Sequence, residues 1–289
     1  MKWHAVCGMP YLVIKLIIMK KRTKIEIIIL VIFIICWIIS WIPVTETITL
    51  DIDKVDGDGF RIVLISDLHS GYYGNNQKDL IKMVDDANPD IVLLAGDIFD
   101  DDLKKTNAEI ATRELANKYD CYYVTGNHEY WSGEVPQIKE YLRGLGITVL
   151  EGDCSHINVN GIDIDICGID DPTRLADSTW KAQLDKAYSE TNPDSVKILV
   201  SHRPERVSVY EQYDFDLIVS GHAHAGQVVI PFINRGLYAP NQGIFAKYIN
   251  GAYTLSNGST LVVSRGLARE STPLPRFFNN PEIVVIDIM

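Results

Sequence analysis

The sequence predicts an α/β protein with two stacked β-sheets and helices outside them, and three observations support this fold class. Five short apolar segments rich in β-branched residues alternate with longer mixed segments, a pattern typical of buried strands joined by helices. A second group of apolar segments lacks helices between its members, which indicates antiparallel or mixed pairing. Hydrophobic residues make up 47% of the 289 positions, enough to fill a sizeable core.

The first group of strands is expected to form a largely parallel core. Each segment is bounded by Gly, Asp or Asn, as short buried strands usually are. A helix is predicted over residues 77–87, between the first two strands, and another over residues 104–119, between the second and third. The five strands are residues 61–66, 91–95, 122–125, 196–201 and 216–220.

The second group of strands completes the two sheets. Before this group, residues 45–53 and 60–66 are predicted to form two strands, joined by a turn that contains two Asp-Gly pairs. Because the first strand starts at residue 45, hardly any linker is expected ahead of the globular body, residues 44–289. The strands of this group are residues 147–152, 156–159, 162–169, 227–232, 260–265 and 282–288.

An apolar run near the N-terminus predicts a membrane anchor. Residues 27–42 read IIILVIFIICWIISWI, with a Lys/Arg cluster before them and a proline after them. As a helix this run is about 24 Å long, slightly under the hydrocarbon core, and Trp37 and Trp41 suit a membrane interface. We therefore expect a single-pass transmembrane signal anchor over residues 25–43. The cationic flank predicts that the body faces the extracytoplasmic side of the cell membrane.

Two other interpretations of this run are a cleaved signal peptide and a buried core helix. No cleavage site of small residues follows Ile42, and a core helix would not need the cationic flank. The basic N-terminal segment, residues 1–24, contains a Met-Lys-Lys-Arg sequence typical of the start of an anchor. This pattern favours a true start near Met19.

Charge and cysteine content exclude some functions. The formal net charge is -11, and six of the 27 Lys and Arg residues lie in residues 1–24, which contain no acidic residue. No nucleic-acid partner is expected on that balance, and bound phosphates would need positive charge from another source, such as metal ions.

The cysteines show no CxxC pair, so we interpret them as buried thiols rather than a disulfide framework. They are Cys7, Cys36, Cys121, Cys154 and Cys167.

Each of the five core strands is followed by a potential metal ligand. In open α/β sheets the carboxyl ends of the strands share one crevice, and side chains two positions apart on an extended turn point the same way. Taken singly, each histidine has a structural interpretation and each aspartate is a turn former. Carboxylate, imidazole and carboxamide together suit Mn, Fe or Zn better than Ca. The histidines at strand ends are His69, His128, His202, His222 and His224.

In chain order these segments resemble the five motifs of the calcineurin-like metallophosphoesterases. The resemblance spans about residues 60–227, and the C-terminal segments resemble a membrane-anchored or exported branch, some of whose members act on lipid-linked pyrophosphates. It implies a four-layer α/β/β/α sandwich of two mixed sheets with two metal ions. The motifs are Asp67-x-His69, Gly96-Asp97-x-x-Asp100, Gly126-Asn127-His128-Glu129, His202 and Gly221-His222-x-His224.

The resemblance also implies a role for each residue. Asp67, His69 and His224 would hold one metal, and Asn127, His202 and His222 would hold the second. Asp97 would bridge the two. His128 would donate a proton to the leaving oxygen, with Asp100 as its orienting carboxylate. Asp170, Asp171, Arg203, Arg265 and Arg276 are weaker candidates for substrate binding, and ordinary loop and surface roles are favoured for each of them.

The function implied is a membrane-tethered, dinuclear metal-dependent phosphoesterase. Hydroxide generated at the two metals, Mn, Fe or Zn, would attack a phosphodiester or pyrophosphate bond, in a lipid-linked or envelope substrate. One alternative is a metal-dependent phosphomonoesterase. Another, from a different class, is an inactive metal-binding scaffold at the membrane.

Overall fold

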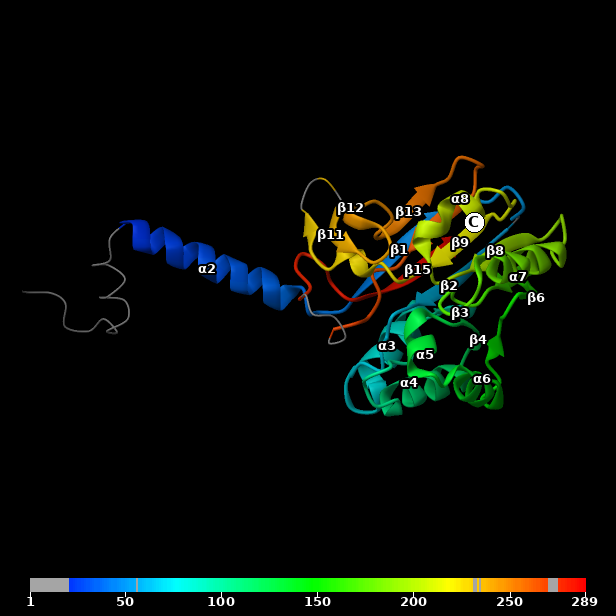
Figure 1. Cartoon of the computed structure of the whole chain (residues 1–289), viewed down its shortest axis with the longest axis horizontal. Helices are drawn as coiled ribbons and strands as arrows, with labels where there is room; N and C mark the ends of the chain where they lie inside the picture. The colour runs from blue at the N-terminus through cyan, green and yellow to red at the C-terminus, as the bar shows by residue number, and fades with distance from the viewer. Residues whose placement is uncertain (1–20, 56, 231–232, 234, 270–274) are drawn as a thin grey trace, which may run out of the picture.

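A computed structural model describes residues 21–55, 57–230, 233, 235–269 and 275–289 of the chain. In Figure 1 one helix extends away from a body of sheets and helices. The predicted start near Met19 and most of the predicted basic segment lie outside the described residues.

The extended helix is α2, Lys21–Ile39, and it covers most of the predicted anchor (Figure 1). Its apolar side chains are largely exposed, from Ile25 at 48% to Ile39 at 50%. Four charged residues occupy its first six positions. Within the part of the chain that the structure describes, no helix is both long enough and apolar enough to cross a membrane. The predicted anchor over residues 25–43 and the orientation derived from it stay predictions.

The first sheet has six strands in the order β1-β15-β2-β3-β4-β5. Three of its strands, β2, β3 and β4, are parallel to one another. A helix follows β2 and another follows β3, and each returns the chain to the edge of the sheet at which the preceding strand began. The strands are β1 (Val44–Leu50), β2 (Phe60–Ile65), β3 (Ile91–Ala95), β4 (Asp120–Val124), β5 (Thr148–Val149) and β15 (Glu282–Ile288). The helices on this side are α3 (Lys78–Ala87), α4 (Thr106–Ala116), α5 (Asn127–Ser132) and α6 (Val135–Gly144), with the short 3-10 helix η1 (Asn75–Gln77) before α3.

The second sheet also has six strands, in the order β13-β14-β9-β8-β7-β6. Its strands are β6 (Asp153–Val159), β7 (Ile162–Gly168), β8 (Val196–Val200), β9 (Leu217–Ser220), β13 (Gly251–Thr254) and β14 (Thr260–Val263). Helices α7 (Asp177–Ser189) and α8 (Val207–Tyr210) and the 3-10 helix η2 (Pro204–Arg206) accompany it. A small third sheet contains β10 (Val229–Ile230), β11 (Arg235–Ala239) and β12 (Gly243–Ala246).

Three hydrophobic clusters separate the layers. The first packs α3, α4 and α6 against the first sheet, through side chains such as Leu80, Leu115 and Leu142. The second lies between the two large sheets, where Ile62 faces residues such as Ile198. The third packs α7 and α8 against the second sheet. Three cores between successive layers produce the α/β/β/α order implied by the family resemblance.

Two local expectations were wrong. Strands β1 and β2 do not pair as a hairpin, because β15 lies between them, parallel to β1 and antiparallel to β2. Cys154 and Cys167 are joined in a disulfide rather than present as thiols, whereas Cys36 and Cys121 are free. The turn between β6 and β7 explains the disulfide. Asn160 and Gly161 both have positive φ, as a two-residue hairpin turn requires, and the resulting register places the two cysteines directly opposite each other.

Candidate metal centre

The predicted ligands lie on loops that leave five strands of the two sheets. The loops after β2 and β3 carry Asp67, His69 and Asp97, and Asn127 begins α5 directly after β4. In the second sheet, His202 follows β8, and the loop after β9 supplies the remaining histidines. Both sheets present these carboxyl-end loops to the same crevice, so residues more than 150 positions apart become neighbours.

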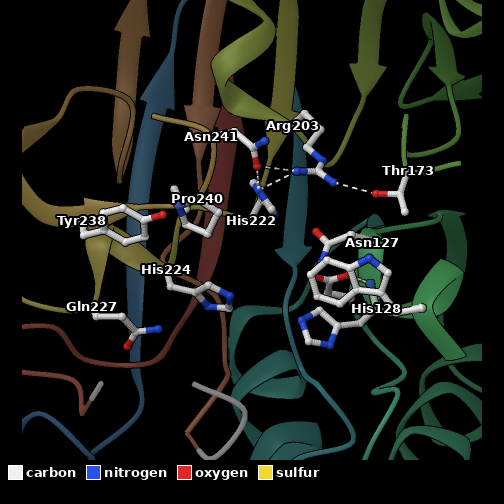
Figure 2. Close-up of a pocket in the computed structure, with 13 residues that line it drawn as sticks. Asn127, His128, Thr173, Arg203, His222, His224, Gln227, Tyr238, Pro240 and Asn241 are labelled. Carbon is white, nitrogen blue, oxygen red and sulfur yellow. Dashed lines mark hydrogen bonds between the residues drawn. The ribbon is translucent and has the colours of Figure 1, made fainter. Parts of the chain in front are cut away.

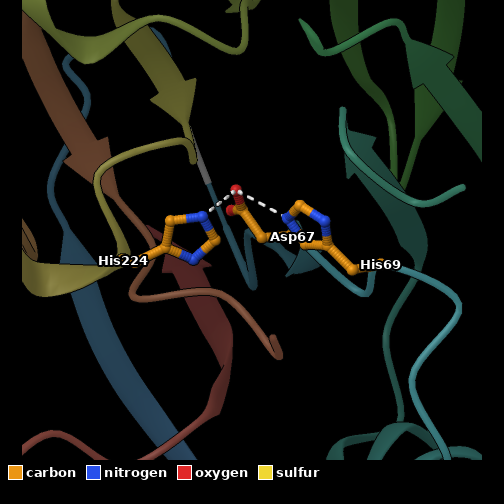
Figure 3. A group of neighbouring side chains, drawn as sticks. All are labelled: Asp67, His69 and His224. Atoms are coloured by element: carbon orange, nitrogen blue, oxygen red, sulfur yellow. Dashed lines mark ion pairs between the residues drawn. The ribbon is translucent and has the colours of Figure 1, made fainter. Parts of the chain in front are cut away.

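The first group of side chains is Asp67, His69 and His224 (Figure 3). His224 Nε2 lies 3.6 Å from Asp67 Oδ1, and His69 Nε2 lies 4.0 Å from the same oxygen. All three residues are buried. Asp67 also accepts the backbone N–H of His222 at 3.0 Å, which ties the loop after β2 to the loop after β9.

The second group is Asp97, His202 and His222. His202 Nε2 lies 3.0 Å from Asp97 Oδ2, and the same oxygen lies 3.7 Å from His69 Nε2 of the first group. Asp97 therefore lies between the two groups. Asn127 is buried beside them on the pocket wall.

The donor atoms of these groups fit divalent cations. Among the buried polar atoms of the described residues that have no hydrogen-bond partner, five belong to predicted ligands: His69 Nε2, Asp97 Oδ2, Asn127 Oδ1, His202 Nε2 and His224 Nδ1. The other ring nitrogens of His202 and His69 are engaged, since His202 Nδ1 donates to the carbonyl oxygen of Ala95 at 2.8 Å and His69 Nδ1 lies 2.9 Å from Asp100 Oδ2. Such contacts fix the tautomer that leaves Nε2 with a free lone pair for a metal.

Backbone strain is concentrated at the same positions. Non-glycine residues rarely adopt positive φ, and its presence at a site generally reflects a functional constraint. Gly126 and Gly221 allow the loops to approach, because a Cβ at these positions would collide with the Asp97 and Asp67 carboxylates, respectively. Five predicted ligands have left-handed φ: Asp67 (51°), His69 (48°), Asp97 (52°), His222 (64°) and His224 (45°).

The pKa values within the centre reflect burial and mutual charge. Burial alone would raise the pKa of Asp97, but His202 outweighs burial and holds this pKa well below its usual range. Burial alone would lower the pKa of His202, whereas Asp97 raises it to about 10. Burial and the charge of Arg203 lower the pKa of His222 to about 3, so this ligand is neutral near pH 7.

Glu129 connects two of the ligand loops from inside the protein. Its Oε1 accepts the backbone N–H groups of Ile98 and Phe99 at 2.8 and 3.0 Å. Its Oε2 accepts those of Asp97 and Gly126 at 3.0 and 2.8 Å. The buried carboxylate thereby holds the loop after β3 against the loop after β4. Its position beside Asn127 and His128 in the sequence motif gave no indication of this role.

The orienting carboxylate of His128 differs from the prediction. His128 Nδ1 lies 2.5 Å from Asp101 Oδ1 but 3.6 Å from Asp100 Oδ2. Asp100 instead contacts His69, and its other oxygen accepts the backbone N–H groups of Asp102 and Leu103 at 2.9 and 2.8 Å. The turn formed by those two hydrogen bonds points Asp100 inward and leaves Asp101 beside His128.

A pocket of about 390 Å³ opens over the two groups (Figure 2). One wall contains Trp131, whose ring packs on His128 with 4.6 Å between centroids. The opposite wall contains Tyr238, Pro240 and Asn241, from β11 and the turn after it. Sequence reasoning missed these wall residues, because residues 235–246 match none of the motifs and only the fold returns them to the site.

Asn241 and Arg203 surround the outer nitrogen of His222 (Figure 2). His222 Nε2 lies 2.7 Å from Arg203 Nη1 and 3.0 Å from Asn241 Oδ1, and Arg203 also donates to that Asn241 oxygen at 2.8 Å. Because a guanidinium can only donate, Nε2 of His222 accepts from Arg203 in this arrangement. Arg203 is itself held by both oxygens of Asp171.

The other candidates for substrate binding have internal partners. Arg265 pairs with Glu282, and Arg276 donates to the backbone carbonyl oxygens of Arg265, Gly266 and Ala268. Asp170 pairs with Lys139 at 2.7 Å. These residues stabilise loops around the site and do not line the pocket.

The fold and the ligand geometry define a metallophosphoesterase, and the chain belongs to the calcineurin-like phosphoesterase family. The family profile matches residues 60–226, which include all five ligand loops. The family uses divalent metal ions, and the clustered His and Asp residues of this chain are able to bind them.

Individual relatives agree with this assignment. An uncharacterized metallophosphoesterase of Helicobacter pylori is 31% identical over 244 residues, covering 82% of this chain and 62% of that protein. A transmembrane protein with metallophosphoesterase domain from Bos taurus is 28% identical over 247 residues, covering 80% of this chain and 54% of that protein. The chain thus spans less than two thirds of the length of these two relatives. Among solved structures, NAD nucleotidase of Haemophilus influenzae aligns with a TM-score of 0.48 and 20% identity over 72% of this chain and 45% of that one.

Proposed function

We propose that this protein hydrolyses phosphodiester or pyrophosphate bonds with two divalent metal ions, drawn from Mn, Fe and Zn. The observation that supports the proposal is the position of Asp97, whose Oδ2 lies 3.0 Å from His202 in one ligand group and 3.7 Å from His69 in the other. A carboxylate placed in this way suits a bridge between two cations. When bound, such a pair of cations neutralises the charge of a phosphate group and lowers the pKa of water towards neutrality.

Each half of the centre has its own ligands in this proposal. Asp67, His69 and His224 hold the first cation, and His202, His222 and Asn127 hold the second. Their mixture of imidazole, carboxylate and carboxamide donors supports the choice of Mn, Fe or Zn.

His128 is the proposed proton donor to the leaving oxygen. Its side chain lines the pocket, and its backbone N–H donates to Asp97 Oδ1 at 2.8 Å, which places the ring at the edge of the centre. Asp101 engages Nδ1 and so leaves Nε2 as the ring nitrogen for proton transfer. This assignment replaces Asp100 with Asp101 as the positioning carboxylate.

Membrane association is also proposed. It is supported by the exposed apolar side chains of α2 and by the name of the bovine relative. The proposal concerns contact with a membrane and does not depend on a helix that crosses it.

A hydrolysis assay tests the proposed activity. The full chain is depleted of metal, reloaded with Mn, Fe or Zn, and assayed with bis(p-nitrophenyl) phosphate, p-nitrophenyl phosphate and a pyrophosphate diester. We expect faster hydrolysis of the diester or the pyrophosphate than of the monoester. A preference for the monoester would identify a phosphomonoesterase, and absence of hydrolysis at full metal loading would identify a metal-binding scaffold.

A further inference from the structure

The small sheet beside the pocket has an unusually apolar surface. Its strands β11 and β12 form a hairpin in which Tyr238 pairs with Ile244. Ile244 is 69% exposed and Phe245 is 57% exposed, although the sheet borders a well-packed body. Together with Phe278 these side chains form an apolar patch, which we define as Ile233, Leu237, Tyr238, Ile244, Phe245 and Phe278.

The apolar patch is joined to helix α2. Phe277 stacks on Phe33 of α2 with 4.5 Å between ring centroids, and its backbone oxygen accepts the N–H of Val229 in β10. At the C-terminal end of α2, Asn280 Nδ2 donates to the carbonyl oxygens of Ile39 and Ile42. Figure 1 shows β11 and β12 on the side of the body from which α2 extends. The exposed apolar residues of the helix and the patch therefore lie on the same side of the protein.

The charge of this region differs from that of the rest of the chain. Residues 217–269 contain no Asp or Glu, in a protein with a formal net charge of -11. The same stretch contains four cations, Arg235, Lys247, Arg265 and Arg269. Arg265 is paired with Glu282, so the cations of this stretch in or next to β11 and β12 are Arg235 and Lys247. Exposed apolar side chains with basic neighbours complement an anionic lipid surface. The same region of a second copy would instead bring cations against cations.

Aromatic residues in the last turn of α2 and just after it support the same partner. Trp37 and Trp41 lie near the end of the helix that joins the body, with 5.9 Å between ring centroids. Tryptophan side chains favour the level of the lipid headgroups, where the ring has an apolar and a polar neighbour.

We infer that α2 and the apolar patch form one face that rests on an anionic bilayer, with β11 and β12 at the level of the headgroups. Tyr238 belongs to both the patch and the pocket wall, and Pro240 follows it on the same wall. The pocket of a docked protein is thus adjacent to lipid headgroups. Resting on the proposed function, this inference assigns headgroup phosphodiesters or pyrophosphates as the substrate class.

Photo-crosslinking of the full chain tests the docking face. p-Benzoylphenylalanine replaces Phe245 or, as a matched control, Met289, an exposed apolar residue at the end of β15. The protein is mixed with phosphatidylcholine vesicles with or without phosphatidylglycerol and irradiated. We expect a lipid adduct from position 245 that increases with phosphatidylglycerol, and none from position 289. A protein dimer from position 245, or no lipid adduct there, would overturn the inference.

A kinetic experiment separates docking from catalysis. The double variant Ile244→Ser/Phe245→Ser changes two patch residues that do not line the pocket. We expect its rate on a vesicle-embedded phosphodiester to fall at least about fivefold, because the apolar contact with the bilayer is weakened. Its rate on bis(p-nitrophenyl) phosphate stays unchanged. Unchanged rates on both substrates would count against docking through the patch.

The two proposals fail in different ways. A wild-type protein that hydrolyses neither substrate refutes the proposed function, while the crosslink at position 245 still reports on the docking face. Conversely, hydrolysis of bis(p-nitrophenyl) phosphate without a lipid adduct refutes the docking face alone. If the double variant slows on both substrates equally, the pair of substitutions affects the fold and the crosslink decides.

Discussion

His128 Nδ1 lies 2.5 Å from Asp101 Oδ1, whereas Asp100 Oδ2 lies 2.9 Å from His69 Nδ1. Two adjacent aspartates thus contact histidines with different proposed roles, one in proton transfer and one in metal binding. The difference makes the two carboxylates separable by experiment.

Substitution of His128 tests proton donation. We expect His128→Ala to reduce turnover about 10²-fold or more on diesters with poor leaving groups, since these depend on protonation of the leaving oxygen. Rates with p-nitrophenol as the leaving group fall much less. Steady-state kinetics on both substrates and elemental analysis provide the measurement. Equal rates on poor leaving groups would remove His128 from the mechanism.

The neighbouring aspartates are expected to differ. Asp100→Asn removes the charged acceptor of His69, so metal affinity falls about tenfold or more. Asp101→Asn leaves metal affinity unchanged and lowers turnover on poor leaving groups. Metal titration of both variants distinguishes them, with Asp102→Asn, on an exposed neighbour, as the matched control. The opposite pattern would return Asp100 to the position beside His128.

Substitution of Asp97 tests the bridge. Asp97→Asn replaces a charged side chain between the two ligand groups with a neutral one, and we expect loss of metal from both. Elemental analysis after extensive dialysis provides the measurement. A variant with one metal retained would assign Asp97 to a single site, and full occupancy would contradict any role as a ligand.

Glu129 is expected to stabilise the protein through the four N–H groups that it accepts. Glu129→Ala leaves these buried donors without acceptors, at a cost of about 1–3 kcal/mol for each donor that no water reaches. We expect the free energy of unfolding of the metal-free protein to fall by about 3 kcal/mol or more. Urea denaturation measures the change, and Glu140→Gln on the exposed face of α6 is the control. An unchanged midpoint would show that other groups hold the two loops together.

Metal binding should release protons. Without metal, the pKa of His202 is about 10, so its ring carries a proton at pH 7 to 9 that a metal must displace. The pKa of Asp97 is well below its usual range and that of His222 is about 3, so neither adds a proton in this window. Apparent affinity should therefore increase with pH up to about pH 10.

Calorimetry in two buffers with different ionisation enthalpies measures this proton release at pH 8. A binding enthalpy that does not depend on the buffer would show that His202 is already neutral. In that case the charge of Asp97 is balanced by another group.

The sequence by itself determined the strands of the core, the loops that follow them and the types of ligand those loops present. These features are local, because strand ends follow from apolar runs bounded by turn residues, and one strand direction brings their loops to one edge. The Asn160-Gly161 turn also contained enough information to pair Cys154 with Cys167, since a two-residue turn fixes the register of its hairpin.

Only the tertiary structure decided which groups act together. The choice between Asp100 and Asp101 as the partner of His128 depends on a turn that aims one carboxylate inward, and consecutive residues give no sign of that choice. Asn241 and Tyr238 reach the pocket because the chain returns to it after β10, and Glu129 has four partners from two loops. Such contacts join segments far apart in the sequence, so they exist only once the two sheets have packed.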